Sequence, residues 1–210
     1  MQDTFTNILE LTGHVLTKPV KSHELFDEVF YTFNIEVKRL SFVSDILPVT
    51  VSEKTLSLFK IDEGDLIKVT GQLRSYNHIK EGSSKLVLTV FCKKLSPSEN
   101  EFENDVSLMG YVCRKPTYRI TPFGREITDL LLAVNRAYNK SDYIPLIVWG
   151  KNARLTSDLQ IGDRIRIEGR LQSREYEKVL DTKKEIRTAY EVSVSTITLP
   201  DKKVLEKTDS

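Results

Sequence analysis

The chain has 210 residues, of which 40% are hydrophobic and 29% charged, a composition typical of a globular protein. No apolar run approaches the ~18 residues that a membrane span needs, and the N-terminus lacks a basic-then-apolar signal peptide, so we expect a cytoplasmic protein. Cys92 and Cys113 stand apart without metal-ligand spacing, which predicts buried thiols, with neither a disulfide framework nor a metal site.

The net charge of +1 conceals two unlike halves. Residues 1–105 carry 12 Lys and Arg against 16 Asp and Glu, a balance of −4. Residues 106–199 carry 16 against 11, a balance of +5, and the last eleven residues carry three of each. The second half is therefore the better candidate for an anionic partner.

The first half of the chain predicts five strands and one short helix. Apolar and polar residues alternate as in half-buried strands, and turn residues separate the runs. The predicted strands are residues 8–16, 29–40, 46–51, 66–73 and 86–95, and the predicted helix is residues 55–59.

The second half predicts the same order of elements. An acidic, turn-rich segment without periodicity, residues 96–105, is expected to be a linker. The predicted strands that follow are residues 107–113, 127–136, 143–149, 164–171 and 188–199, with a short helix at 151–158. Residues 118–120 are expected to extend the first of these strands beyond Pro116, and residues 201–210 form a polar tail.

Short motifs repeat at an offset of about 97 residues. The pairs are residues 11–19 and 108–116, 45–48 and 142–145, 64–65 and 162–163, and 71–73 and 169–171. We therefore interpret the chain as two copies of one domain, residues 1–95 and 106–200. A short helix between the third and fourth of five strands is the layout of the OB fold, a Greek-key barrel. The prediction is an all-β protein with two tandem OB-fold barrels.

The second copy carries aromatic residues where an OB barrel exposes its surface. They are Tyr138, Tyr143, Trp149 and Tyr176. The basic residues that interleave with them are Arg125, Arg136, Lys140, Lys151, Arg170 and Arg174. Any base can stack on an aromatic face and cations can track phosphates, so this combination predicts a site for a single-stranded nucleic acid.

The alternative is that the four aromatic residues belong to the core. The residues at the matching positions of the first copy are Ser41, Ile46, Ser52 and His78. A shared core should keep bulk at equivalent places, as Val15 and Val112 do, so aromatic residues absent from one copy indicate a surface role. Phe42 and Tyr76 lie beside two of these positions, and a shift of one residue in the comparison would weaken the argument.

Several separated motifs of the second copy resemble the bacterial single-stranded DNA-binding protein (SSB) family. They are Phe-Gly-Arg-Glu-Ile-Thr at 123–128, Leu-Ala-Val-Asn-Arg at 132–136, Tyr-Ile-Pro-Leu-Ile-Val-Trp-Gly-Lys at 143–151 and the run at 162–176. The resemblance covers about residues 106–199 and is weak for the first copy. It implies sequence-nonspecific binding of single-stranded DNA in replication, recombination or repair. It further implies that the four aromatic residues stack on bases and that Lys151, Arg170 and Arg174 occupy basic positions of the family.

Two features depart from the family pattern. Most replicative members are single-barrel chains that form tetramers, so two barrels in one chain imply a homodimer that presents four OB folds. Typical members end in a flexible linker and an acidic tip that closes in Pro-Phe, whereas the last five residues here are Glu-Lys-Thr-Asp-Ser. We therefore expect an accessory or specialised protein, in which the first barrel serves assembly or supplies a weaker site.

Other functional classes receive less support. His14, His23 and His78 lie far apart and outside any nucleophile or metal motif, and isolated glycines form no phosphate-binding loop. We predict no enzyme, no cofactor, no metal and no small-molecule substrate. An OB-fold interaction module, such as a primosome or repair scaffold with weak DNA or RNA binding, remains the alternative. RNA binding would use the same stacking surface.

Overall fold

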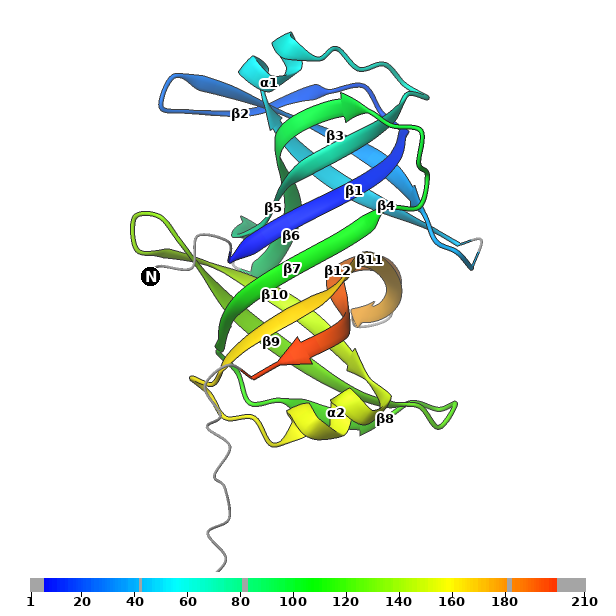
Figure 1. The fold of residues 1–210 in the computed structure, drawn as a ribbon, viewed down its shortest axis with the longest axis vertical. Coiled ribbons are helices and arrows are strands. Elements are labelled where there is room, and N and C mark those ends of the chain that lie inside the picture. Colours follow the sequence, from blue (N-terminus) through cyan, green and yellow to red (C-terminus); the bar gives the residue numbers. More distant parts are fainter. Residues whose placement is uncertain (1–5, 42, 81–82, 181–182, 200–210) are drawn as a thin grey trace, which may run out of the picture.

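The structure is a computed structural model that describes residues 6–41, 43–80, 83–180 and 183–199, and all their side chains except those of residues 78–80, 83–85, 178–180 and 183. This part of the chain forms two β-barrels, one above the other (Figure 1). Their strands belong to one continuous twelve-stranded sheet. No helix in the described ranges is long and apolar enough to cross a membrane. The predicted tail, residues 201–210, lies outside the described residues.

The first barrel closes from five strands in the cyclic order β1-β3-β4-β6-β5. They are β1 (Asn7–Val15), β3 (Glu28–Lys38), β4 (Ser44–Ser52), β5 (Leu66–Lys80) and β6 (Ser83–Pro97). β4 and β6 pair in parallel, whereas the other neighbours are antiparallel. Helix α1 (Glu53–Leu58) lies between the third and fourth barrel strands, which is the OB arrangement.

The second barrel repeats this topology in the order β7-β9-β10-β12-β11. Its strands are β7 (Asn104–Val112), β9 (Glu126–Arg136), β10 (Lys140–Trp149), β11 (Arg164–Leu180) and β12 (Lys183–Thr198). Helix α2 (Gly150–Ser157) again precedes the fourth strand. The predicted pair of five-stranded OB barrels, each with a short helix after its third strand, is confirmed.

Each barrel also carries one short strand that the sequence analysis did not identify correctly. β8 (Thr117–Ile120) pairs with β9 from Thr117↔Asp129 to Ile120↔Glu126, so the expectation that these residues extend the first strand is wrong. β2 (Val20–Leu25) pairs with β3 in the same way. All residues of β2 and β8 are exposed, so neither strand shows the alternation that reveals a half-buried strand.

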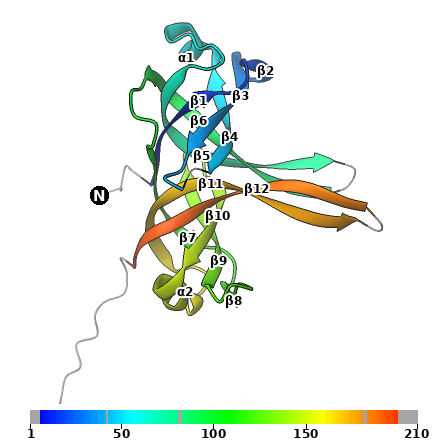
Figure 2. The same ribbon diagram turned by 90° about the vertical axis from the view of Figure 1, so that its right-hand side faces the viewer.

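Two hairpins extend beyond the barrels. β5 with β6, and β11 with β12, project from the same side of the molecule (Figure 2). Each hairpin begins at a glycine-marked bulge, where the register shifts between Thr70 and Gly71 or between Glu168 and Gly169. A Cβ atom on Gly169 would clash with the carbonyl oxygen of Ser193, so this corner of the barrel requires glycine.

Inward-facing aliphatic side chains fill both barrels, and Val15 and Val112 occupy matching core positions. Cys92 is buried and Cys113 is half-buried, so the predicted burial of both thiols is complete only for the first. Burial raises the pKa of the Cys92 thiol to about 12. The thiol is therefore almost fully protonated near neutral pH, and its role is that of a small apolar core residue.

β1 and β7 form the seam between the barrels. They pair antiparallel from Asn7↔Leu108 to Leu11↔Asn104. The acidic residues 96–105 lie beside this seam, and two of their carboxylates bind lysines of the first barrel. Lys38 Nζ lies 2.6 Å from Glu101 Oε2, and Lys68 Nζ lies 2.6 Å from Glu103 Oε1.

Two buried aspartates, one in each barrel, accept hydrogen bonds from the other barrel across the seam. The carboxylate of Asp45 accepts hydrogen bonds from the backbone nitrogen of Ser173 at 2.6 Å and from its Oγ at 3.0 Å. Asp142, which is equivalent to Asp45 in the repeat, accepts a hydrogen bond from the backbone nitrogen of Ser75 at 2.8 Å. Both aspartates are at most 1% exposed. The repeated Asp-x-x-Pro motif therefore fastens each barrel to the long hairpin of the other.

We expect Asp45→Asn to lower the free energy of unfolding by about 3 kcal/mol, because it removes the charged partner of Arg39, whose Nε lies 2.6 Å from the carboxylate. Asp129→Asn is the matched control, since the Arg119–Asp129 pair is 40–46% exposed and its loss should cost less than about 1 kcal/mol. Urea denaturation of the three proteins tests this difference. Equal small losses for both variants would show that Asp45 does not hold the barrels together.

Candidate nucleic-acid interface

Trp149 lies on the outer surface of the second barrel and not in its core. It is the last residue of β10, and Gly150, with a φ of 58°, turns the chain into helix α2. The side chain of Trp149 is directed over β12, where its Nε1 donates a hydrogen bond to Ser193 Oγ at 3.2 Å. The residue is 37% exposed. The hydrogen bond fixes the ring and leaves part of its surface open to solvent.

A groove of about 500 Å³ runs beside this ring. Its cations are Arg125, Arg170 and Arg174 of the second barrel and Arg39 of the first. We call it the Trp149 groove. Four guanidinium groups around one exposed aromatic ring suit a chain that alternates bases with phosphates.

The four arginines are not equivalent. The hydrogen bond to Asp45 raises the pKa of Arg39, and Arg174 Nε lies 3.4 Å from Glu191 Oε1. Burial, together with the nearby Arg39 charge, lowers the pKa of Arg170. Arg125 is exposed at the edge of the groove. Carboxylates therefore anchor Arg39 and Arg174, while Arg125 is free to follow a ligand.

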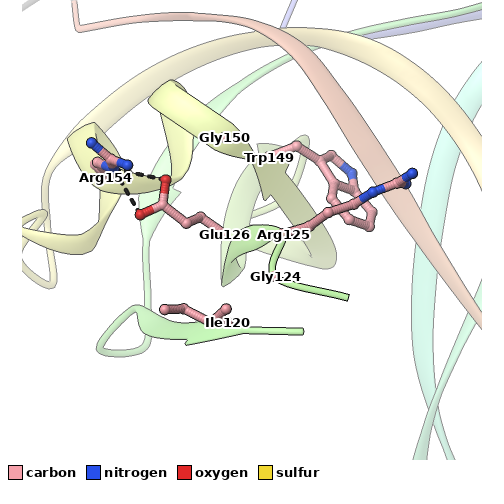
Figure 3. Close-up of a pocket in the computed structure, with 7 residues that line it drawn as sticks. All are labelled: Ile120, Gly124, Arg125, Glu126, Trp149, Gly150 and Arg154. Atoms are coloured by element: carbon pink, nitrogen blue, oxygen red, sulfur yellow. Dashed lines mark hydrogen bonds and ion pairs between the residues drawn. The ribbon is translucent and has the colours of Figure 1, made fainter. Parts of the chain in front are cut away.

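A second hollow, of about 670 Å³, lies on the α2 side of Trp149 (Figure 3). Arg125 lines both the hollow and the groove, and its side chain extends past the Trp149 ring (Figure 3). Glu126 accepts hydrogen bonds from Arg154 Nε at 2.7 Å and from the Tyr118 hydroxyl at 2.5 Å. The Arg154 bond lowers the pKa of Glu126, which stays ionised and neutralises Arg154. Of the two cations that line this hollow, Arg154 is paired with Glu126, whereas Arg125 is exposed beside Trp149.

The structure places the other predicted aromatic residues at separate points. Tyr143 is 44% exposed and shares a face of β10 with Trp149. Tyr138 is 94% exposed and lies in the β9–β10 turn with a φ of 62°. Tyr176 is half-buried on the projecting hairpin, where the guanidinium carbon of Arg174 lies 5.9 Å from its ring centroid.

The ten predicted site residues do not form one cluster. Trp149, Arg125, Arg170 and Arg174 share the Trp149 groove. Lys140 and Lys151 are exposed and line none of the grooves described here. Arg136 lies at a different groove and pairs with the buried Asp142, its Nη1 3.6 Å from Oδ1. Arg136 therefore has a structural partner that the sequence did not indicate.

The sequence analysis did not predict two residues of the surface around Trp149. Arg39 comes from the first barrel, and no local pattern shows that it reaches the groove of the second. Phe123 is 91% exposed at the tip of the β8–β9 turn, next to Gly124 and Arg125. The Thr-Pro-Phe-Gly sequence at 121–124 is typical of a turn, and the apolar side chain at its tip was a signal that could have been used.

The single-strand binding protein family model matches residues 103–200. This match covers the second barrel and the segment that leads into it. The single-stranded DNA-binding protein of Clostridium tetani is 40% identical over 81 residues, which are 35% of this chain and 56% of that protein. The corresponding protein of Bacillus cereus is 36% identical over 81 residues, 35% of this chain and 48% of that protein. The chain thus spans about half the length of these curated relatives.

Solved structures extend the likeness to both barrels. The wild-type single-stranded DNA binding protein of Thermus aquaticus covers 92% of this chain and 92% of its own, with a TM-score of 0.75 and 23% sequence identity. A deletion mutant of the same protein covers 96% and 97%, with a TM-score of 0.75 and 22% identity. At this identity the likeness shows a shared fold.

Proposed function

We propose that this protein binds single-stranded DNA without sequence preference, in replication, recombination or repair, and that the Trp149 groove is its principal site. The observation that carries the proposal is the partly exposed Trp149 ring beside Arg125, Arg170 and Arg174. The match of the second barrel to the family model supports it, as do the names of the curated relatives.

The geometry explains why such binding would not depend on base identity. The polar atom of Trp149, Nε1, already donates to Ser193, so the ring offers a stacking face and no free donor. Every base has a π-face, and stacking is therefore tolerant of sequence. Arg125 on one side of the ring and Arg174 in the groove supply cations for successive phosphates. Neutralised phosphates release counterions, so affinity should fall as salt rises.

Trp149→Ala should weaken binding of an oligo-dT by about 1–3 kcal/mol, the range for one base–aromatic stack. Ser52→Ala at the matching position of the first barrel is the control. It removes the cap of α1, where Ser52 Oγ accepts from the Thr55 nitrogen at 3.2 Å, and costs about 1 kcal/mol of stability but little affinity. Fluorescence anisotropy of a labelled strand at fixed salt measures both. Equal affinities for Trp149→Ala and the unmodified protein would show that Trp149 does not stack on a base.

Arg125→Gln should reduce the slope of log K against log salt by about 0.7, the contribution of one phosphate contact on a single strand. Arg119→Gln is the matched control, since Arg119 lies on the neighbouring β8 and pairs with Asp129 at 2.8 Å, outside the groove. Titrations at four or more salt concentrations give the slopes. The same slope change in both variants would indicate a general charge effect and no contact by Arg125.

We also infer a homodimer that presents four OB folds. Its support is the resemblance of the second barrel to a family whose single-barrel members form tetramers, together with the two barrels of this chain. The β1–β7 seam is already used within the chain, so the dimer needs another surface. Sedimentation equilibrium should give twice the chain mass of 24.1 kDa. A single-chain mass throughout the micromolar range would contradict the inference.

A further inference from the structure

We propose that Glu191, a buried carboxylate in the Trp149 groove, repels the phosphates of a bound strand and thereby limits the affinity of the groove and speeds the release of the strand. This inference rests on the proposed function and concerns the regulation of that same site. A groove for a polyanion would bind more tightly without a carboxylate, so the presence of Glu191 has a consequence for function.

Glu191 lies on the groove face of β12. It is two residues from Ser193, which binds the Trp149 indole, so the two side chains point to the same side of the strand. Both residues line the Trp149 groove, whereas Val192 between them belongs to the core. The side chain of Glu191 is 8% exposed. Glu191 therefore forms part of the groove floor.

Two neighbours on β11 hold one oxygen of this carboxylate. Gln172 Nε2 donates a hydrogen bond to Glu191 Oε1 at 2.9 Å, and Arg174 Nε donates one to the same oxygen at 3.4 Å. Arg174 is nevertheless 49% exposed along its side chain. The guanidinium can therefore meet a phosphate while its Nε stays with Glu191.

This arrangement sets a carboxylate and a phosphate against each other. A phosphate bound to the far side of the Arg174 guanidinium would lie on the order of 7 Å from the Glu191 carboxylate, because one guanidinium separates them. The buried carboxylate is poorly screened by water, so the repulsion is stronger than it would be in bulk solvent. The strand would thus be attracted by the arginines of the groove and repelled by one anion at its floor.

The charge of Glu191 also acts on arginines beyond its direct partner. The hydrogen bond to Asp45 is the main cause that raises the pKa of Arg39, and the charge of Glu191 raises it further. The hydrogen bond to Asp129 is the main cause that raises the pKa of Arg119, and Glu191 again adds to it. Arg39 and Arg119 lie in different barrels, so the field of this one carboxylate extends across the surface around the groove.

The fold does not require a carboxylate at this place. Thr89 of the first barrel is equivalent to Glu191, because the residues that follow them, Val90 and Val192, both pair with the leucine of the repeated Gly-x-Leu motif. Thr89 is as buried as Glu191, at 8% against 6% exposure, and its Oγ1 lies 2.9 Å from Thr50 Oγ1. A neutral side chain therefore serves the same barrel position, which separates the charge of Glu191 from the needs of the fold.

The test uses Glu191→Gln, with Glu168→Gln as its matched control. A glutamine at position 191 keeps an oxygen that can accept from Gln172 and Arg174, so the variant removes the charge and retains the packing. Glu168 is exposed on β11 and lines a different hollow, so its variant makes the same charge change outside the groove. Glu191→Asp is the third variant, since it keeps the charge but shortens the side chain that holds Arg174.

Fluorescence anisotropy of a labelled oligo-dT at fixed salt gives the affinity, and stopped-flow competition with unlabelled oligo-dT gives the dissociation rate. Glu191→Gln should bind about fivefold more tightly or better, mainly through slower dissociation, because related complexes differ mostly in that rate. Glu168→Gln and Glu191→Asp should both stay within about twofold of the unmodified protein, since neither removes a charge from the groove.

An affinity of Glu191→Gln equal to or below that of the unmodified protein would overturn the inference. An equal gain in Glu168→Gln would show a general charge effect, and an equal gain in Glu191→Asp would show that the hold on Arg174 matters and the charge does not. Either gain would also overturn the inference. All these outcomes leave the proposed function intact, because the strand still binds. A complete lack of binding by the unmodified protein and every variant would instead defeat the proposed function, and this inference with it.

Discussion

Backbone pairing between β1 and β7 fixes the two barrels at one register, and the Trp149 groove depends on that register. The pairing brings Asp45 within hydrogen-bonding distance of Ser173 and Asp142 within the same distance of Ser75. Because Asp45 also binds Arg39, the arginine of the first barrel is held in the groove of the second. The contact that joins the barrels therefore also positions the cations of the proposed binding surface.

The two copies keep the same scaffold but distribute their surface chemistry differently. Their cores match position by position, and both aspartates and both cross-barrel arginines are retained. The aromatic ring is not retained: Trp149 ends β10 of the second barrel, whereas Ser52 ends β4 of the first. A barrel surface tolerates this exchange because the partly exposed Trp149 ring is not needed to fill the core. Such a surface can change its binding properties without a change of fold.

Much of the fold could be predicted from the sequence because burial leaves a local pattern. The apolar–polar alternation, the repeat and the position of the short helix were sufficient to predict two OB barrels. The strands β2 and β8 were not predicted, because all their residues are exposed and show no apolar alternation. The predicted fourth strands end at Leu73 and Leu171, whereas β5 continues to Lys80 and β11 to Leu180. Residues 173–177 of β11 are half-buried or exposed, so this part of the strand shows no apolar alternation.

The residues that the second barrel supplies to the Trp149 groove could be predicted from the sequence, but the residue that the first barrel supplies could not. The surface position of Trp149 followed from its absence in the first copy, and three basic residues predicted with it share its groove. The contribution of Arg39 could not be predicted, since it depends on Asp45 and Ser173, which are 128 residues apart.

The most direct test of the account is a titration of the unmodified protein with oligo-dT that follows Trp149 fluorescence at several salt concentrations. Trp149 is the single Trp of the chain, so its emission reports one place on the second barrel. The account predicts strong quenching at low stoichiometry that weakens as salt rises. Unchanged emission, with no binding in a parallel gel shift, would contradict single-strand binding. Binding without quenching would contradict the stacking role of Trp149.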